Sequence, residues 1–189
     1  LVLAPKRVAQ LVWTKEHLDW EHLQHLTVSL GLGSAAKRRK MLLLEPRDIA
    51  IQTIDNIQWL MKELAPLPDD HPLFDLLVVD ESSRLKNPRS KRARELFKQI
   101  DRFRNVWLTT GTPRPNGIAD QFMPMKLLSG GRMWGKSYDA WEQRNFTSDY
   151  TGFKKEVIPE RAPTFEQDIK KYTYAIDPDD MDELPGLVT

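Results

Sequence analysis

Five short apolar runs alternate with amphipathic stretches along this sequence, and this alternation constrains the fold more than any other feature. The runs, which we interpret as strands, lie at 1–4, 26–30, 48–53, 76–80 and 105–109. The candidate helices lie at 6–19, 34–43, 55–64, 89–101, 118–128 and 138–145. Strands that alternate with helices at this spacing are typical of a parallel sheet. We therefore expect an α/β fold of three layers, in which helices cover both faces of a central parallel sheet.

Two acidic residues follow the most apolar of these runs. Leu76–Val79 has no alternation, as expected for a strand that is covered on both faces, and Asp80 and Glu81 come directly after it. Right-handed crossovers place the carboxyl ends of parallel strands along one edge, where ligands bind. One carboxylate could hold a magnesium ion there while the other orients a water. An apolar run followed by two acids is equally typical of a strand that simply ends at solvent.

The next strand candidate makes the functional interpretation more specific. Residues 106–109 are followed by Thr110, Gly111, Thr112 and Pro113, a small turn that is rich in hydroxyl groups. Because the two strand ends lie at the same sheet edge, acids and hydroxyls come together there. The pair of features predicts a site for phosphate and magnesium.

These segments resemble the motifs of a known family. Val78–Pro88 (VVDESSRLKNP) resembles motif II of the Swi/Snf-like branch of superfamily 2 helicases, in the form found in phage and bacterial members, and Trp107–Gly117 (WLTTGTPRPNG) is similar to motif III. Leu3–Pro5 with the helix behind it looks like motif Ia, and Asp48–Leu60 looks like motif Ib. The motifs occur in the family's order across residues 1–146. The resemblance implies the first RecA-like lobe of an ATP-dependent DNA helicase or translocase of DEAD/DEAH-box type, which uses ATP and Mg²⁺ and works with a second RecA-like lobe.

The resemblance also assigns roles to individual residues. Asp80 would bind the magnesium ion through water, and Glu81 would polarise the attacking water. Motif III residues would couple the nucleotide state to the DNA path; these are Thr110, Gly111 and Thr112. The residues placed near the nucleic-acid backbone are Pro5, Lys6, Arg7, Gln52, Thr53 and Lys86, the last of which would also support motif II together with Asn87.

One departure from the family's pattern concerns the residues after the two acids. Ser82 and Ser83 stand where the common forms have Ala-His or Ala-Asp. The missing histidine removes a side chain that helps to link the two lobes in the family. The details of coupling between the lobes are therefore expected to differ.

A glycine-rich segment matches the phosphate-loop pattern literally. Gly130–Ser137 reads GGRMWGKS, which satisfies G-x-x-x-x-G-K-[ST]. A phosphate-binding loop must follow a strand and open a helix, whereas residues 121–128 contain Pro124 and have no strand pattern. The segment also follows motif II, while the family's phosphate loop precedes motif Ia. We therefore interpret it as a turn with Ser137 as a helix N-cap, and keep a complete P-loop enzyme as a weaker alternative.

The expected domain organisation follows from these motifs. Residues 1–146 are expected to form the first lobe without its P-loop strand, and residues 147–189 an irregular extension towards the second lobe. Four prolines interrupt that extension, and only 165–176 looks regular. Because the sequence begins inside an apolar run without a methionine, we expect a fragment whose motif I lies upstream of Leu1. Such a fragment is expected not to hydrolyse ATP alone. The alternative is a non-catalytic docking module for nucleic acid or protein.

Composition limits the remaining classes. With 40% hydrophobic and 29% charged residues the chain is typical of a soluble globular domain. No apolar run approaches the length of about 18 residues that spans a membrane. The absence of cysteine excludes disulfides and thiolate zinc sites and is compatible with the cytoplasm of a bacterium or a bacterial host cell. Three nearby histidines lack the spacing of a zinc site; they are His17, His22 and His25.

Two surface features are ambiguous in the sequence. Basic residues cluster at 37–40 and along the candidate helix at 89–98, where a solvated helix face is favoured over a phosphate-binding patch. Trp13, Trp59 and Trp107 lie in elements that must pack on the sheet, so we expect them in the core.

Overall fold

The computed structural model describes residues 1–45, 47–68, 73–114, 116–148 and 155–175. The chain divides into two compact units, Leu1–Arg144 and Asn145–Thr189. No helix among the described residues is long and apolar enough to cross a membrane.

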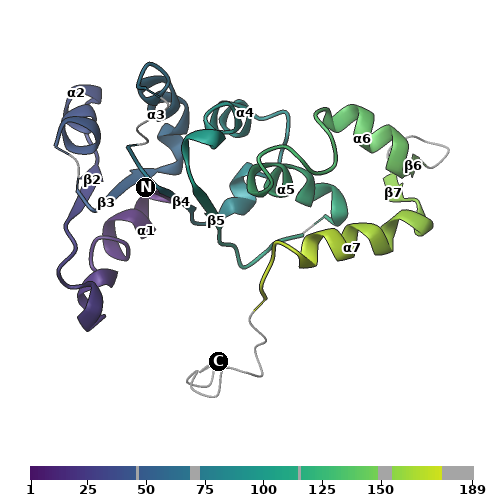
Figure 1. Ribbon diagram of the computed structural model, residues 1–189, viewed down its shortest axis with the longest axis horizontal. Coiled ribbons are helices and arrows are strands. Elements are labelled where there is room, and N and C mark those ends of the chain that lie inside the picture. The colour runs from purple at the N-terminus through teal and green to yellow at the C-terminus, as the bar shows by residue number, and fades with distance from the viewer. Residues whose placement is uncertain (46, 69–72, 115, 149–154, 176–189) are drawn as a thin grey trace. The chain divides into compact units, whose positions relative to one another are not determined.

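The first unit is built on a five-stranded sheet in which every neighbouring pair is parallel. The strands are β1 (Val2–Ala4), β2 (Val28–Gly31), β3 (Ile49–Thr53), β4 (Leu76–Val79) and β5 (Asn105–Leu108). Their order across the sheet is β2-β3-β1-β4-β5 (Figure 1). All five strands lie within one or two residues of the predicted positions, so the parallel α/β prediction is confirmed.

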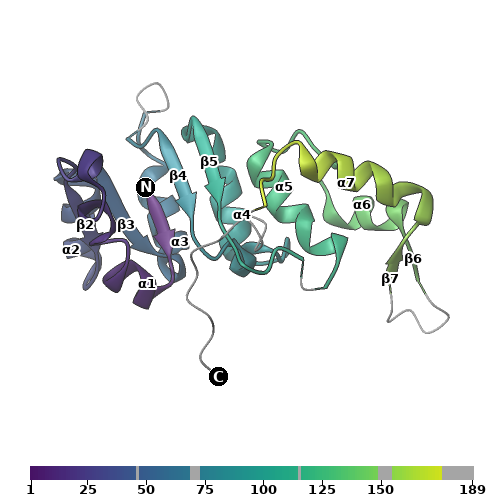
Figure 2. The same ribbon diagram turned by 90° about the horizontal axis from the view of Figure 1, so that it is seen from below.

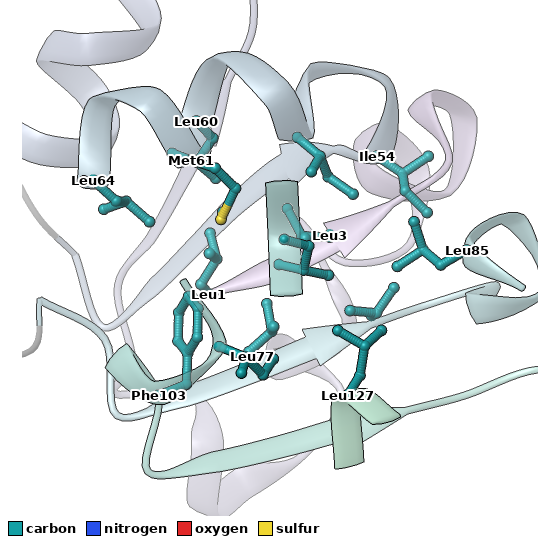
Figure 3. Close-up of a cluster of buried hydrophobic side chains, with 14 of the residues drawn as sticks. Leu1, Leu3, Ile54, Leu60, Met61, Leu64, Leu77, Leu85, Phe103 and Leu127 are labelled. Carbon is teal, nitrogen blue, oxygen red and sulfur yellow. The ribbon is translucent and has the colours of Figure 1, made fainter. Parts of the chain in front are cut away.

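Alternation along the strands sends side chains to two separate hydrophobic clusters. Leu3 and Leu77 belong to the larger cluster, which also contains buried residues of α3 (Ile57–Leu64), α4 (Lys91–Lys98) and α5 (Phe122–Leu128). Figure 3 shows side chains of α3 meeting those of β1 and β4 in this cluster. Val2 and Val78 point the other way, towards residues of α1 (Lys6–Leu11). Helices therefore cover both faces, which confirms the three-layer architecture.

Several helices are shorter than predicted, whereas the helix at Tyr138–Asn145 matches its predicted range. The predicted helix at 6–19 ends at Leu11 and continues as two 3-10 helices, Glu16–Leu18 and Glu21–Leu23. A β-branched Thr14 follows α1, and its hydroxyl donates to the carbonyl of Gln10 at 2.8 Å, a bond that competes with helix continuation. The remaining helices of this unit are α2 (Ala35–Arg39), which continues into a π-helical turn at Lys40–Leu44, and α6 (Tyr138–Asn145), whose last residue falls in the second unit.

One core prediction was wrong. Trp107 is 61% exposed, whereas Trp13 and Trp59 are half-buried as parts of the packing around the sheet. Trp107 lies on β5, the last strand of the sheet order, and its neighbours Val106 and Leu108 point to the covered face. On the opposite face α1 packs against β1 and β3. An apolar strand pattern cannot distinguish such an edge strand from a central one.

The second unit contains more regular structure than predicted. Strands β6 (Phe146–Ser148) and β7 (Lys155–Val157) form an antiparallel pair, and α7 spans Ala162–Lys170 (Figure 2). The sequence predicts regular secondary structure only from residue 165, because proline usually interrupts helices. In the structure Pro163 occupies the first turn of α7, where proline is tolerated. The part of the predicted irregular extension at 176–189 lies outside the described residues.

Candidate functional site

Four strand ends meet along one edge of the sheet in the first unit. Because β1 lies between β3 and β4, the segments after these strands are neighbours, and β5 continues the row. The amide of Asp80 donates to the carbonyl of Leu3 at 2.8 Å, and the amide of Thr109 donates to the carbonyl of Val79 at 3.0 Å. The residues that resemble motifs Ia, Ib, II and III therefore lie at a single edge.

The carboxylate of Asp80 is held by two hydrogen bonds from different elements. The indole N–H of Trp13 donates to Oδ2 at 2.9 Å, and the hydroxyl of Thr109 donates to Oδ1 at 2.9 Å. Asp80 is half-buried, so these bonds fix a side chain that is still accessible to solvent. Each carboxylate oxygen keeps a free lone pair, which leaves room for a magnesium-bound water.

Glu81 adopts a left-handed backbone conformation, with φ 58° and ψ 52°. For a residue other than glycine this conformation costs on the order of 1 kcal/mol and is found most often at functional sites. The hydroxyl groups of Ser83 and Thr110 both donate to Oε1 of Glu81, the latter at 3.4 Å. The serine that replaces the family's histidine therefore holds the glutamate within the lobe.

The motif III residues connect the two strand ends. The amide of Ser82 donates to the carbonyl of Thr109 at 2.9 Å, and the amide of Thr112 donates to the hydroxyl of Thr110 at 3.1 Å. Gly111 is exposed, and no atom lies within 4 Å of the position that a side chain would take there. Thr110 thus contacts both Glu81 and its own turn.

Lys86 makes a second connection between the motif II and motif III segments. Its ammonium group lies 3.2 Å from Oδ2 of Asp120, and both side chains are largely buried. Asp120 also accepts hydrogen bonds from the amide and side chain of Asn116 at 2.9 and 3.2 Å. This ion pair joins Lys86, in the segment that resembles motif II, to the residues just after the segment that resembles motif III.

The residues assigned to the nucleic-acid backbone fall into two groups. Lys6 and Arg7 are exposed, and Pro5 is half-buried, at the start of α1. Gln52 and Thr53 are 0% and 4% exposed, and Oε1 of Gln52 accepts the amide of Thr53 at 2.6 Å. Their side chains also bind Asn56, at 3.3 and 2.8 Å. Burial therefore argues against a direct phosphate contact by Gln52, which instead supports the turn after β3.

The side chains present fit a magnesium ion that is carried by a nucleotide. Among the described residues no group of three or more His, Asp or Glu side chains could enclose a metal ion. Magnesium usually keeps several waters and binds one or two carboxylates together with substrate phosphates, so a dedicated cage is not needed. Asp80 and Glu81 at the sheet edge are the carboxylates that could bind such an ion.

The glycine-rich segment does not have the geometry of a phosphate loop. It follows helix α5, not a strand. Ser137 caps α6: its hydroxyl accepts the amide of Ala140 at 3.4 Å, and its carbonyl accepts that of Trp141 at 3.0 Å. The interpretation of this segment as a turn and helix cap is confirmed, and an enzyme built on it as a P-loop is disfavoured.

Two contributors to the site were missed in the sequence. The sequence predicts Trp13 only as a core packing residue and Thr109 only as the last residue of a strand. Both bind Asp80 through side-chain donors. The position of Thr109 at the end of an apolar run indicates that its hydroxyl lies near the sheet edge. The hydrogen bond from Trp13 to Asp80 depends on the path of the chain after α1, which the sequence does not show.

A parallel sheet with acids and hydroxyl groups at adjacent strand ends is typical of nucleotide-binding α/β domains, which include the RecA-like class. The particular family follows from comparison with known proteins: the sequence matches the SNF2-related domain over residues 1–172, and the chain belongs to this family. The prediction of the first RecA-like lobe of a Swi/Snf-like protein is thereby confirmed.

Two similar proteins illustrate the relationship. Protein p41 of Acyrthosiphon pisum secondary endosymbiont phage 1 is 36% identical over 151 residues, which cover 77% of this chain and 32% of that protein. The Sulfolobus solfataricus SWI2/SNF2 ATPase core, solved in complex with dsDNA, is similar in fold with a TM-score of 0.57 and 22% identity. That match covers 76% of this chain and 27% of the solved one. The chain therefore spans about a third of the length of these relatives.

Proposed function

We propose that this chain supplies the magnesium- and water-orienting part of an ATP-dependent DNA translocase or helicase. The observation that carries the proposal is the pair Asp80 and Glu81 at the end of β4, hydrogen-bonded to Thr109 and Thr110 at the end of β5. Asp80 would hold the magnesium ion of a bound nucleotide, and Glu81 would orient a water towards its γ-phosphate. When bound, MgATP supplies the phosphoryl group and the charge that neutralises its oxygens.

The same edge offers a route for coupling to DNA. Trp13 follows α1 and binds Asp80, while Lys6 and Arg7 are exposed at the start of that helix. A phosphate backbone bound at Lys6 and Arg7 is therefore one helix away from the magnesium carboxylate. The solved relative in complex with dsDNA supports duplex DNA as the partner. Such contacts with phosphates are expected to weaken steeply with salt.

Catalysis by this type of protein requires parts that the described residues do not include. The phosphoryl group must be held by a P-loop, and arginines from a second lobe stabilise the transition state. Gly130–Ser137 lacks the strand that a P-loop needs. We therefore propose that the chain alone does not hydrolyse ATP and acts together with a P-loop strand and a second RecA-like lobe.

The experiment is DNA-stimulated ATP hydrolysis by the longest polypeptide that contains this chain. Asp80→Asn and Glu81→Gln should each lower kcat by at least about 100-fold. Asp75→Asn is the matched control, because Asp75 precedes the same strand at its opposite end and is exposed; it should retain activity. Full hydrolysis by both variants would refute the roles proposed for Asp80 and Glu81. DNA binding by the parent without any hydrolysis would favour the non-catalytic docking module.

A further inference from the structure

A cavity of about 280 Å³ lies between α4, α5 and the start of α6, formed by residues other than those that hold the two acids. Its aromatic walls are Phe97, Phe122 and Tyr138. The rings of Phe122 and Tyr138 meet edge to face with centroids 5.2 Å apart. The cavity is therefore lined mainly by apolar surface, of a size that accepts one large side chain.

Four cationic side chains surround this apolar floor: Arg94, Lys98, Lys126 and Lys136. Lys98 is paired with Glu95 at 2.8 Å. In the part of the chain that the structure describes, Arg94 and Lys136 form no ion pair. The acids on the nearby helix α6 are already engaged, Asp139 with Arg89 and Glu142 with the hydroxyl of Tyr138. The rim therefore carries an excess of positive charge.

Lys126 is the cation that lies deepest in this arrangement. Its ammonium group lies 4.4 Å from the ring centroid of Phe97 and donates to the carbonyl of Lys136 at 2.7 Å. Burial lowers the pKa of Lys126, which shows that its charge is poorly solvated. An anionic group in the cavity would compensate this loss of solvation.

Two unexplained features of the sequence converge here. Arg94 and Lys98 belong to the basic helix that follows motif II, and Lys136 belongs to the segment that imitates a P-loop. Gly131 explains why that segment is rich in glycine: it has φ +77°, and a Cβ there would lie 2.7 Å from Cζ of Phe97. The glycine allows the turn to pass close to α4, and the turn then brings Lys136 to the rim.

We propose that this cavity is a docking site for an acidic peptide segment of a partner protein that carries one large apolar side chain. The apolar side chain occupies the aromatic floor, and flanking carboxylates pair with Arg94, Lys126 and Lys136. A nucleic acid fits less well, because a base can enter an apolar cavity only after it leaves its stack, at a cost of a few kcal/mol. Charge complementarity and apolar lining together favour the peptide.

The test is fluorescence anisotropy of the full chain with short labelled peptides in which Phe, Trp or Leu is flanked by Asp and Glu. Replacement of the central residue by Ala should weaken binding by about tenfold or more. Arg94→Glu and Lys136→Glu should each weaken it by about tenfold. Both residues are exposed, so the fold should persist, and thermal unfolding verifies this. Arg94→Gln provides a second variant that removes the charge without reversing it.

Lys91→Glu is the matched control, because Lys91 is an exposed cation of the same helix that does not line the cavity. It should change binding by no more than about twofold. An effect equal to that of Arg94→Glu would mean nonspecific attraction and would overturn the proposal. The proposal would also fail if no peptide of the set bound more tightly than millimolar, or if a single-stranded oligonucleotide bound at Arg94 and Lys136 in place of the peptides. Because the readout is peptide binding, it is independent of ATP hydrolysis.

Discussion

The hydrogen bond between Trp13 and Asp80 gives the most direct quantitative test of how the site is built. Trp13→Phe keeps an aromatic ring and removes the indole N–H that donates to Oδ2 of Asp80 at 2.9 Å. A buried hydrogen bond to a charged group contributes roughly 1.5–3 kcal/mol. Because Asp80 is only half-buried, solvent screening lowers the expected contribution to about 1 kcal/mol.

A double-mutant cycle separates this bond from the loss of packing. The free energy of unfolding is measured by urea denaturation for the parent chain, Trp13→Phe, Asp80→Ala and the double variant. The coupling energy between the two positions should be about 1 kcal/mol. Asp80→Ala also removes the bond from Thr109, but this loss cancels in the cycle.

The chain contains a matched control for the same chemistry. The indole of Trp20 donates to Glu16 at 3.4 Å, and Trp20 is 53% exposed. A cycle of Trp20→Phe with Glu16→Ala should give a coupling energy of at most about 0.3 kcal/mol, because long exposed bonds contribute little. Equal coupling in the two cycles, or none between Trp13 and Asp80, would refute the claim that Trp13 positions the carboxylate of Asp80.

Two further substitutions test packing in the first unit. Gly131→Ala should lower the free energy of unfolding by about 1–2 kcal/mol, because an L-residue is strained at φ +77° and its Cβ would press on Phe97. Gly111→Ala is the control: open space surrounds that position, so the free energy of unfolding should change by less than about 0.5 kcal/mol. Equal losses at the two glycines would contradict the described turn. Trp107→Thr should change the free energy of unfolding by less than about 0.5 kcal/mol, since Trp107 is 61% exposed. A loss of about 3 kcal/mol or more, which is roughly the cost of truncating a core tryptophan, would show that Trp107 is a core residue.

The positions of the strands and of the polar residues at their carboxyl ends could be predicted from the sequence for a physical reason. A parallel sheet covered on both faces requires unbroken apolar runs such as Leu76–Val79, and turns at their carboxyl ends carry the polar residues. The positions of Asp80, Glu81 and Thr110 therefore followed from local pattern together with the rule that parallel strands end at one edge.

Features that depend on three-dimensional context could not be predicted from the sequence. Trp107 has the local pattern of a core strand, and only the strand order shows that β5 lies at an edge. The contact of Trp13 with Asp80 joins residues 67 positions apart, beyond the reach of any local pattern. Gln52 was assigned by family resemblance to the nucleic-acid backbone, yet it is fully buried. The cavity at Arg94 and Lys136 likewise arises from helices that the sequence cannot place side by side.

We infer that Asp80 and Glu81 are the two acids of an ATPase site and that the described residues form no phosphate loop. Isothermal titration calorimetry of the chain with MgATP, with and without duplex DNA, tests it directly. We expect absent or millimolar binding that Lys136→Ala leaves unchanged, because the segment that contains Lys136 follows α5 and not a strand. Micromolar binding that Lys136→Ala abolishes would contradict it, and would make Gly130–Ser137 a true phosphate loop.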